Sequence, residues 1–253
     1  MSESGFPYTT RPLKFAHRGA SRAAPENTLA AFQAARDMGA DGVELDVTLC
    51  AGGEVVVIHD DSVDRTTEGR GMVSDLGLDD IKRLDAGAWF GSEFAGERIP
   101  LLREVMAWAG QDMLLNIELK GVSIRSDGLE HAVIQLIREF QLEGRTILSS
   151  FNPFALRRVK QMAPQVETGL LYSLDLPLFL RRAWLRPFAR PDALHPPQDM
   201  VSDAYMAWAR QRGHRVNVWT VDQAEDMARL ISHGVDMIIT NRPDVLASVL
   251  ERS

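Results

Sequence analysis

Cysteine is almost absent from this chain of 253 residues, where Cys50 stands alone. A single cysteine excludes a disulfide within the chain and is typical of a reducing compartment, so we expect a cytoplasmic protein. Residues 1–14 lack the basic stretch followed by an apolar stretch that marks a secretory signal. No apolar run is long enough to cross a bilayer, and stable membrane insertion is therefore not expected.

Positive charge is in the minority, with 28 Lys and Arg against 35 Asp and Glu and a formal net charge of −7. This balance repels polyanions and argues against a nucleic-acid-binding protein. A small anionic substrate is still compatible with it where a local cation recruits the anion. Because α/β barrels commonly reach this length as one unit, we expect residues 1–253 to form a single domain.

Short β-rich segments alternate with helical patterns along the chain, which is typical of a parallel sheet with crossover helices. Eight expected strands can close into a (β/α)8 TIM barrel, and they cover residues 13–16, 42–47, 113–118, 146–150, 167–171, 193–195, 216–220 and 237–240. Helices are expected at residues 28–38, 129–140, 153–162, 202–212 and 222–233. The expected fold class is therefore α/β.

Two segments interrupt this alternation. The turn at residues 50–53 separates the second strand from another β-rich run, 54–58, too closely for a crossover helix, so an antiparallel hairpin is expected. Counting back from the turn brings His59 beside Glu44 at the barrel mouth. Residues 60–100 are rich in glycine and too long for a normal loop. We expect them to form an insertion over the C-terminal rim, with a short helix at 79–85.

Charged residues gather where the expected strands end. In a closed βα barrel, these carboxyl ends face the active site, whereas the interior is otherwise apolar. The charged strand-end residues are His17, Arg18, Glu44, Asp46, His59, Glu118 and Lys120. Because residues two apart on a strand share a face, Glu44 and Asp46 point into one cavity, which Glu118 reaches from the next strand.

Three converging carboxylates repel one another in a low-dielectric pocket unless positive charge compensates them. A divalent cation supplies that charge. Ligands that are all oxygen favour Mg²⁺ or Ca²⁺ over zinc, and the lack of a cysteine pair favours them too. The alternative is that these acids form salt bridges within the barrel or cap helices, but charged strand-end residues in this architecture are more often functional.

An ordered set of short motifs resembles the glycerophosphodiester phosphodiesterase family, in particular its short cytoplasmic bacterial members. The motifs are AHRG at 16–19, APENT at 24–28, VELDV at 43–47, VIHD at 57–60, NIELK at 116–120, VWTV at 218–221 and ITNRP at 239–243. The resemblance extends from Lys14 to the end of the chain. It implies a TIM barrel that hydrolyses glycerophosphodiesters to sn-glycerol 3-phosphate and an alcohol.

The resemblance also implies roles for individual residues. The metal ligands of the family correspond to Glu44, Asp46 and Glu118, its catalytic histidines to His17 and His59, and its phosphate contacts to Arg18 and Lys120. The family has members that use Ca²⁺ and members that use Mg²⁺, and these ligands are compatible with either. Histidine suits both proton transfers of phosphodiester cleavage near neutral pH, one as general base and one as general acid. The nucleophile is either the 2-hydroxyl of the substrate or water.

Other polar and aromatic residues have weaker patterns. His195 and Trp219 end the sixth and seventh strands and are expected to bind substrate, although each could equally be part of the core. Asn27 or Thr28 is expected to cap the first helix. Asp60 and Asp61 either orient His59 or begin the insertion.

Residues 176–190 interleave large apolar side chains with arginines. The pattern suits weak contact with an anionic membrane or a lysophospholipid tail, but it favours a barrel helix with an exposed basic face, because amphipathic helices make up the exterior of a barrel. It leaves a lysophospholipase D activity as the alternative function. A non-catalytic phosphate-binding or metal-binding barrel is the third hypothesis, and the histidine pair argues against it.

Overall fold

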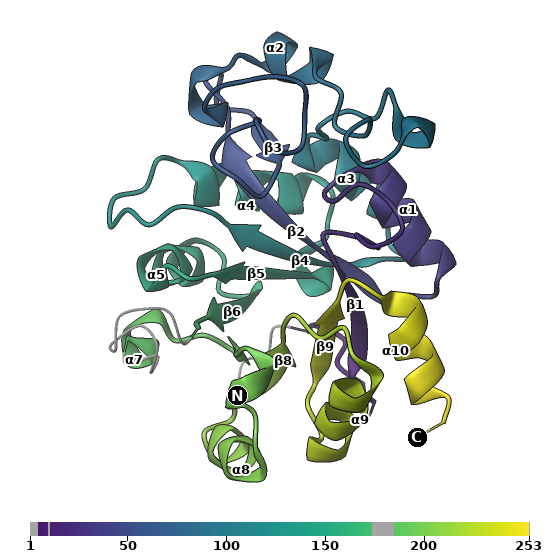
Figure 1. The fold of residues 1–253 in the computed structure, drawn as a ribbon. Helices are drawn as coiled ribbons and strands as arrows, with labels where there is room; N and C mark the ends of the chain where they lie inside the picture. Colours follow the sequence, from purple (N-terminus) through teal and green to yellow (C-terminus); the bar gives the residue numbers. More distant parts are fainter. Residues whose placement is uncertain (1–4, 10, 174–184, 253) are drawn as a thin grey trace.

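The computed structural model describes residues 5–9, 11–173 and 185–252 (Figure 1). Its parallel strands are β1 Leu13–His17, β2 Gly42–Leu49, β4 Leu114–Leu119, β5 Thr146–Ser150, β6 Glu167–Leu171, β7 Ala193–His195, β8 Arg215–Val218 and β9 Met237–Thr240. Each pairs with its neighbour, and β1 pairs with both β2 and β9. The described strands therefore close into the predicted eight-stranded barrel.

Helices surround the barrel (Figure 1). They are α1 Leu29–Asp37, α3 Leu102–Ala109, α4 Leu129–Glu139, α5 Pro153–Met162, α7 Arg186–Ala189, α8 Asp203–Gln211, α9 Ala224–His233 and α10 Pro243–Leu250. Local signals fix their ends. Thr28 caps α1 by accepting a hydrogen bond from the Ala31 backbone at 3.2 Å. Gly234 ends α9 with a φ of 72°, a left-handed conformation that glycine adopts without strain.

The hydrophobic core lies between the strands and the helices. Leu45 and Ile117 on the strands are fully buried together with Phe32 of α1 and Ile137 of α4. Burying one such side chain stabilises the fold by about 1.5–3 kcal/mol. This apolar packing fixes the strand register, and with it the positions of the polar residues at the strand ends.

The predicted hairpin is confirmed by β3 (Val55–Val57), which runs antiparallel to β2 with Val47 opposite Val57. The backbone of Ile58 continues the pairing by donating to the Asp46 carbonyl at 3.0 Å. After the hairpin come the 3-10 helices η1 Val73–Asp75 and η2 Ser92–Phe94 and the helix α2 Leu78–Arg83, which begins one residue before its expected position. The hairpin thus returns the chain at His59 to the level of the acidic residues of β2.

Among the described residues, no helix is long and apolar enough to cross a membrane. Residues 174–184, which include most of the arginine-rich segment 176–190, lie outside the described residues. The described end of that segment contains α7, where Phe188 is 42% exposed and contacts Phe154.

Candidate active site

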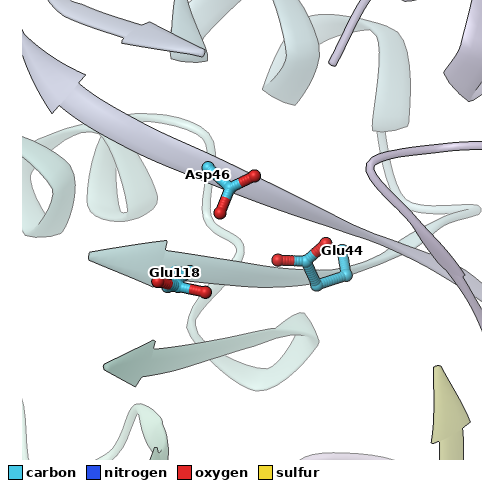
Figure 2. A group of neighbouring side chains, drawn as sticks. All are labelled: Glu44, Asp46 and Glu118. Atoms are coloured by element: carbon cyan, nitrogen blue, oxygen red, sulfur yellow. The ribbon is translucent and has the colours of Figure 1, made fainter. Parts of the chain in front are cut away.

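The register of the strands brings the three predicted carboxylates together. In the pairing of β2 with β4, Glu44 lies beside Asn116 and Asp46 lies beside Glu118. Figure 2 shows the three carboxylates turned toward a common space from two neighbouring strands. One oxygen from each lies within 4.8 Å of the others. Glu44 and Asp46 are buried, and the side chain of Glu118 is 13% exposed. Apolar packing of the barrel thus imposes the convergence that the sequence predicts.

Two cations and an amide surround Asp46. Nζ of Lys120 lies 2.9 Å from Oδ1 of Asp46 and 2.8 Å from Oε1 of Glu118, and Nε of Arg18 lies 3.3 Å from Oδ2 of Asp46. Asn27 does not cap α1 as its position in the sequence suggested. It adopts a φ of 57° and donates from Nδ2 to Oδ2 of Asp46 at 3.0 Å. The Arg18 backbone donates to Oε2 of Glu44 at 3.0 Å.

The charges around the three acids give them different pKa values. Burial tends to raise the pKa of Asp46, but Lys120 and Arg18 outweigh burial and lower it. Burial, followed by the charge of Asp46, raises the pKa of Glu118 to about 7. Burial and the charges of its acidic neighbours also raise the pKa of Glu44 well above its usual value. The two cations therefore do not compensate all three carboxylates.

The donor atoms of the cluster fit a hard divalent cation. Three carboxylates supply oxygen ligands, and added positive charge would favour the ionised form of Glu44, whose pKa is raised by burial and by its acidic neighbours. Asn116 lines the same cavity, and its buried Oδ1 has no hydrogen-bond partner among the described residues. The site can thus hold a metal ion, and its oxygen ligands match Mg²⁺ or Ca²⁺.

The two predicted histidines line the same cavity as this acidic cluster. Nε2 of His17 lies 3.9 Å from Oε2 of Glu44, and its Nδ1 lies 2.7 Å from Oδ1 of Asn241. Burial, followed by the charge of Arg18, lowers the pKa of His17 to about 4, so its ring is neutral at physiological pH. Nδ1 of His59 lies 2.6 Å from Oδ1 of Asp60. Asp60 therefore contacts His59, as expected for a residue that orients the histidine.

A chain of ion pairs that the sequence analysis missed continues from Asp60. Arg65 donates from Nε to Oδ2 of Asp60 at 2.6 Å and binds Glu26 through two hydrogen bonds of 2.9 and 2.7 Å. Glu26 also accepts from Nη1 of Arg18 at 2.8 Å. Hydrogen bonds from Arg65 are the main reason that the pKa of Asp60 is lowered to about 2. The conspicuous APENT motif was the only sequence signal for Glu26.

The two histidines, Glu44 and Glu118 line one cavity of about 170 Å³. Its lining residues are His17, Arg18, Glu44, His59, Asn116, Glu118, Lys120, Ser149, Phe151, Leu171, Trp219 and Ile239. Trp219 therefore lies where the sequence predicted. It meets the ring of Phe151, which sequence reasoning missed, edge to face at 5.6 Å between ring centroids.

His195 does not line the cavity, contrary to the prediction that it binds substrate there. Its side chain is fully buried in the barrel, and Nε2 lies 3.0 Å from Nδ2 of Asn217. The ring fills the space above Gly169, where an added Cβ would lie 2.2 Å from Nε2 of His195. The side chain of His195 therefore lies in the interior of the barrel and not at the cavity.

Fold and site together define a TIM-barrel enzyme with an acidic cluster at the carboxyl ends of its strands and two histidines beside it. The model of the glycerophosphoryl diester phosphodiesterase family matches residues 17–245, and the chain belongs to this family.

Several known proteins are similar over almost their whole length. The glycerophosphodiester phosphodiesterase of Caldanaerobacter subterraneus subsp. tengcongensis is 46% identical over 243 residues, which are 96% of this chain and 99% of the relative. The structure of an Oleispira antarctica phosphodiesterase in complex with the product sn-glycerol-3-phosphate has a TM-score of 0.85 and 31% identity, covering 95% of this chain and 97% of that one. The glycerophosphodiester phosphodiesterase of Agrobacterium tumefaciens has a TM-score of 0.82 and 30% identity, with coverages of 94% and 99%.

Proposed function

We propose that this enzyme hydrolyses glycerophosphodiesters to sn-glycerol 3-phosphate and an alcohol, and that it requires one divalent cation, Mg²⁺ or Ca²⁺. The observation that carries the proposal is the presence of two histidines and the acidic cluster in one cavity. The activity in the name of the Caldanaerobacter relative and the product bound in the Oleispira structure support the same substrate class.

Glu44, Asp46 and Glu118 would hold the cation, which when bound would neutralise charge on a phosphoryl oxygen. Arg18 and Lys120, which line the cavity, would contact the remaining phosphate oxygens. These two side chains already lie against Asp46, so they are held in place before substrate arrives. Such preorganised positive charge lowers the free energy of a transition state in which negative charge accumulates on the phosphoryl oxygens.

Each histidine carries out one of the two proton transfers. His17 is the general base, because its lowered pKa leaves Nε2 free to accept a proton from the nucleophile. His59 is the general acid, since its ring is held by the carboxylate of Asp60, whose Oδ1 lies 2.6 Å from Nδ1. A new bond forms between the nucleophile and phosphorus while the bond from phosphorus to the alcohol oxygen breaks, and His59 gives that oxygen its proton. The nucleophile is either the 2-hydroxyl of the glycerol, in which case water reacts in a second step, or water itself.

The size of the cavity supports a small substrate. Pockets for drug-sized ligands usually enclose about 300–1,000 Å³, whereas this one encloses about 170 Å³. Trp219 and Phe151 would form an apolar wall for the glycerol or the alcohol. Lysophospholipase D activity is the second candidate, and the exposed ring of Phe188 in the arginine-rich segment 176–190 is the observation that favours it.

We further propose that residues 1–253 act as one domain in which 60–100 is an insertion over the C-terminal rim. The contact of Arg65 with Glu26 supports this, because it joins the inserted segment to the loop between β1 and α1. A cytoplasmic location is proposed from the single cysteine, Cys50.

A product assay tests the function directly. Purified protein is incubated with glycerophosphocholine, glycerophosphoethanolamine and lysophosphatidylcholine, each with Mg²⁺, with Ca²⁺ and with a chelator. The expected result is metal-dependent release of sn-glycerol 3-phosphate from the first two substrates. Faster turnover of the lysophospholipid would favour the second candidate, and no turnover of any substrate would contradict both.

A further inference from the structure

The side chain of Asn241 connects His17 to an aspartate in another loop. Oδ1 of Asn241 lies 2.7 Å from Nδ1 of His17, and Nδ2 of Asn241 donates to Oδ2 of Asp222 at 2.7 Å. Asn241 follows β9, and Asp222 lies between β8 and α9, so two loops at the carboxyl ends of neighbouring strands form this connection. None of these contacts involves a residue of the acidic cluster.

The surroundings fix which way the Asn241 amide points. The Asp222 carboxylate offers only acceptor oxygens, so the side-chain group that faces it must be the NH₂. Oδ1 of Asp222 also accepts from the Asn241 backbone at 2.9 Å, which holds the two residues together. Ser21 donates from Oγ to Oδ1 of Asn241 at 2.7 Å on the other side. The amide oxygen is therefore the atom that faces His17.

We propose that Asn241 is a positioning residue that keeps the hydrogen of the His17 ring on Nδ1 and so leaves Nε2 as the nitrogen that accepts a proton. An amide oxygen only accepts hydrogen bonds, so the contact of 2.7 Å requires a hydrogen on Nδ1 of His17. Nε2 then carries the lone pair, and this is the nitrogen 3.9 Å from Oε2 of Glu44. The partner of one ring nitrogen thus decides the state of the other.

This inference rests on the proposed function of His17 as a base and explains how that base is prepared. In the other tautomer, Nε2 carries the hydrogen, so it could not accept a proton from the nucleophile. Asp222 acts one step further away, because without it the Asn241 amide could rotate and present its NH₂ to His17. Asn241 and Asp222 therefore act through His17 and need not touch the substrate.

The tautomer is measurable by ¹⁵N NMR of the whole chain labelled at histidine, with Mg²⁺ present and the His17 resonances assigned through His17→Gln. The expected wild-type spectrum has the hydrogen on Nδ1. Asn241→Leu, which removes the acceptor with little change in volume, is expected to give a mixture of tautomers. It should also lower kcat by at least about 10–100-fold, the loss found when partners that orient metal-binding histidines are removed, and leave KM nearly unchanged.

Two further variants separate positioning from general damage. Asp222→Ala should shift the tautomer in the same direction by a smaller amount, and it provides the test if Asn241→Leu fails to fold. Ser21→Ala removes a donor to the same amide oxygen but keeps the contacts to His17 and Asp222. It should therefore retain the wild-type tautomer.

A wild-type hydrogen on Nε2 would overturn the proposal, and so would variants of Asn241 and Asp222 that keep the Nδ1 tautomer even if their turnover falls. Failure of the proposed function would look different. The wild-type enzyme would then leave glycerophosphocholine intact, while the NMR spectra would still decide the tautomer.

Discussion

Nδ1 of His59 lies 2.6 Å from Oδ1 of Asp60, so a carboxylate supports this histidine while an amide supports His17 at the corresponding nitrogen. The difference bears on the chemistry of each ring. A carboxylate places a full negative charge beside the ring, whereas an amide oxygen adds none. The two partners thus provide a physical reason for assigning different proton-transfer roles to otherwise similar side chains.

Asp60→Asn should impair the acid step selectively. The variant keeps a hydrogen-bonding side chain but loses the negative charge, and kcat on glycerophosphocholine should fall about 10–100-fold. A substrate that releases p-nitrophenolate needs little protonation and should lose much less. The neighbouring exposed Asp61 offers a matched control in Asp61→Asn, which should change neither rate. Equal losses on both substrates would indicate that Asp60 supports the loop rather than the acid.

His17→Ala and His59→Ala should each lower turnover by about 10²–10⁴-fold, the range that a general acid or base contributes. Calorimetric titration with Mg²⁺ or Ca²⁺ should give nearly wild-type affinity for both, because the carboxylates and not the histidines hold the ion. The p-nitrophenyl substrate should rescue His59→Ala and leave His17→Ala impaired. The double variant should lose less than the product of the single losses, since both groups act on one transition state. Rescue of His17→Ala instead would reverse the assignment.

Removal of metal should abolish activity, and Glu44→Gln should separate metal binding from stability. A chelator removes the divalent cation whose charge compensates the acidic cluster, so turnover should stop. Adding Mg²⁺ or Ca²⁺ should restore it. In the metal-free protein, Glu44→Gln should leave the melting temperature unchanged or raise it, because it removes a carboxylate whose pKa is raised by burial and by its acidic neighbours. Added metal should then stabilise the variant less than the wild type.

Glu139→Gln is the control for this experiment, because Glu139, at the end of α4, forms an exposed ion pair with Arg103 at 2.9 Å and is not part of the acidic cluster. It should respond to metal as the wild type does. If Glu44→Gln lowered the melting temperature of the metal-free protein while metal affinity stayed normal, the carboxylate would have a structural role in a barrel salt bridge.

The barrel was predictable because its signals are local and repeated. Each strand is a short apolar run, and the five expected helices have apolar residues at helical spacing with caps such as Thr28 and Gly234. Two helices were missed. α3 follows directly after the glycine-rich insertion, so its eight residues were not separated from that irregular stretch, and α10 begins at Pro243, immediately after the last strand.

Only the part of the candidate site that lies on strands was predictable from the sequence. Alternation along a strand places Glu44 and Asp46 on one face, which requires no knowledge of the rest of the fold. The supporting contacts depend on where loops meet in space: Glu26 and Arg65 are 39 positions apart, and His17 and Asn241 are 224 apart. His195 was placed at the cavity because it ends a strand, but strand position alone does not say how deep in the barrel a ring lies.

His195 also makes the stability of this enzyme depend on pH. Burial lowers the pKa of its imidazole from 6.5 to about 3, so the folded protein resists a proton that the unfolded chain accepts. The folded pKa is the lower one, so the contribution to stability is complete above the unfolded pKa, and it is lost progressively as the pH falls from 6.5 toward about 3. Within that window, one proton changes the free energy of unfolding by about 1.4 kcal/mol per pH unit.

Urea unfolding of the wild type and of His195→Gln between pH 7 and pH 4 isolates this contribution. Glutamine can accept the hydrogen bond from Asn217 but takes up no proton, so below about pH 6 the slope of the free energy of unfolding against pH should be smaller by about 1.4 kcal/mol per unit. Carboxylates titrate in both proteins, and their contributions cancel in the difference. His131→Gln, on the exposed side of α4, serves as the control and should follow the wild-type slope. Parallel curves for His195→Gln and the wild type would mean that acid protonates His195 without unfolding the barrel, so that the ring is less isolated from water than its full burial implies.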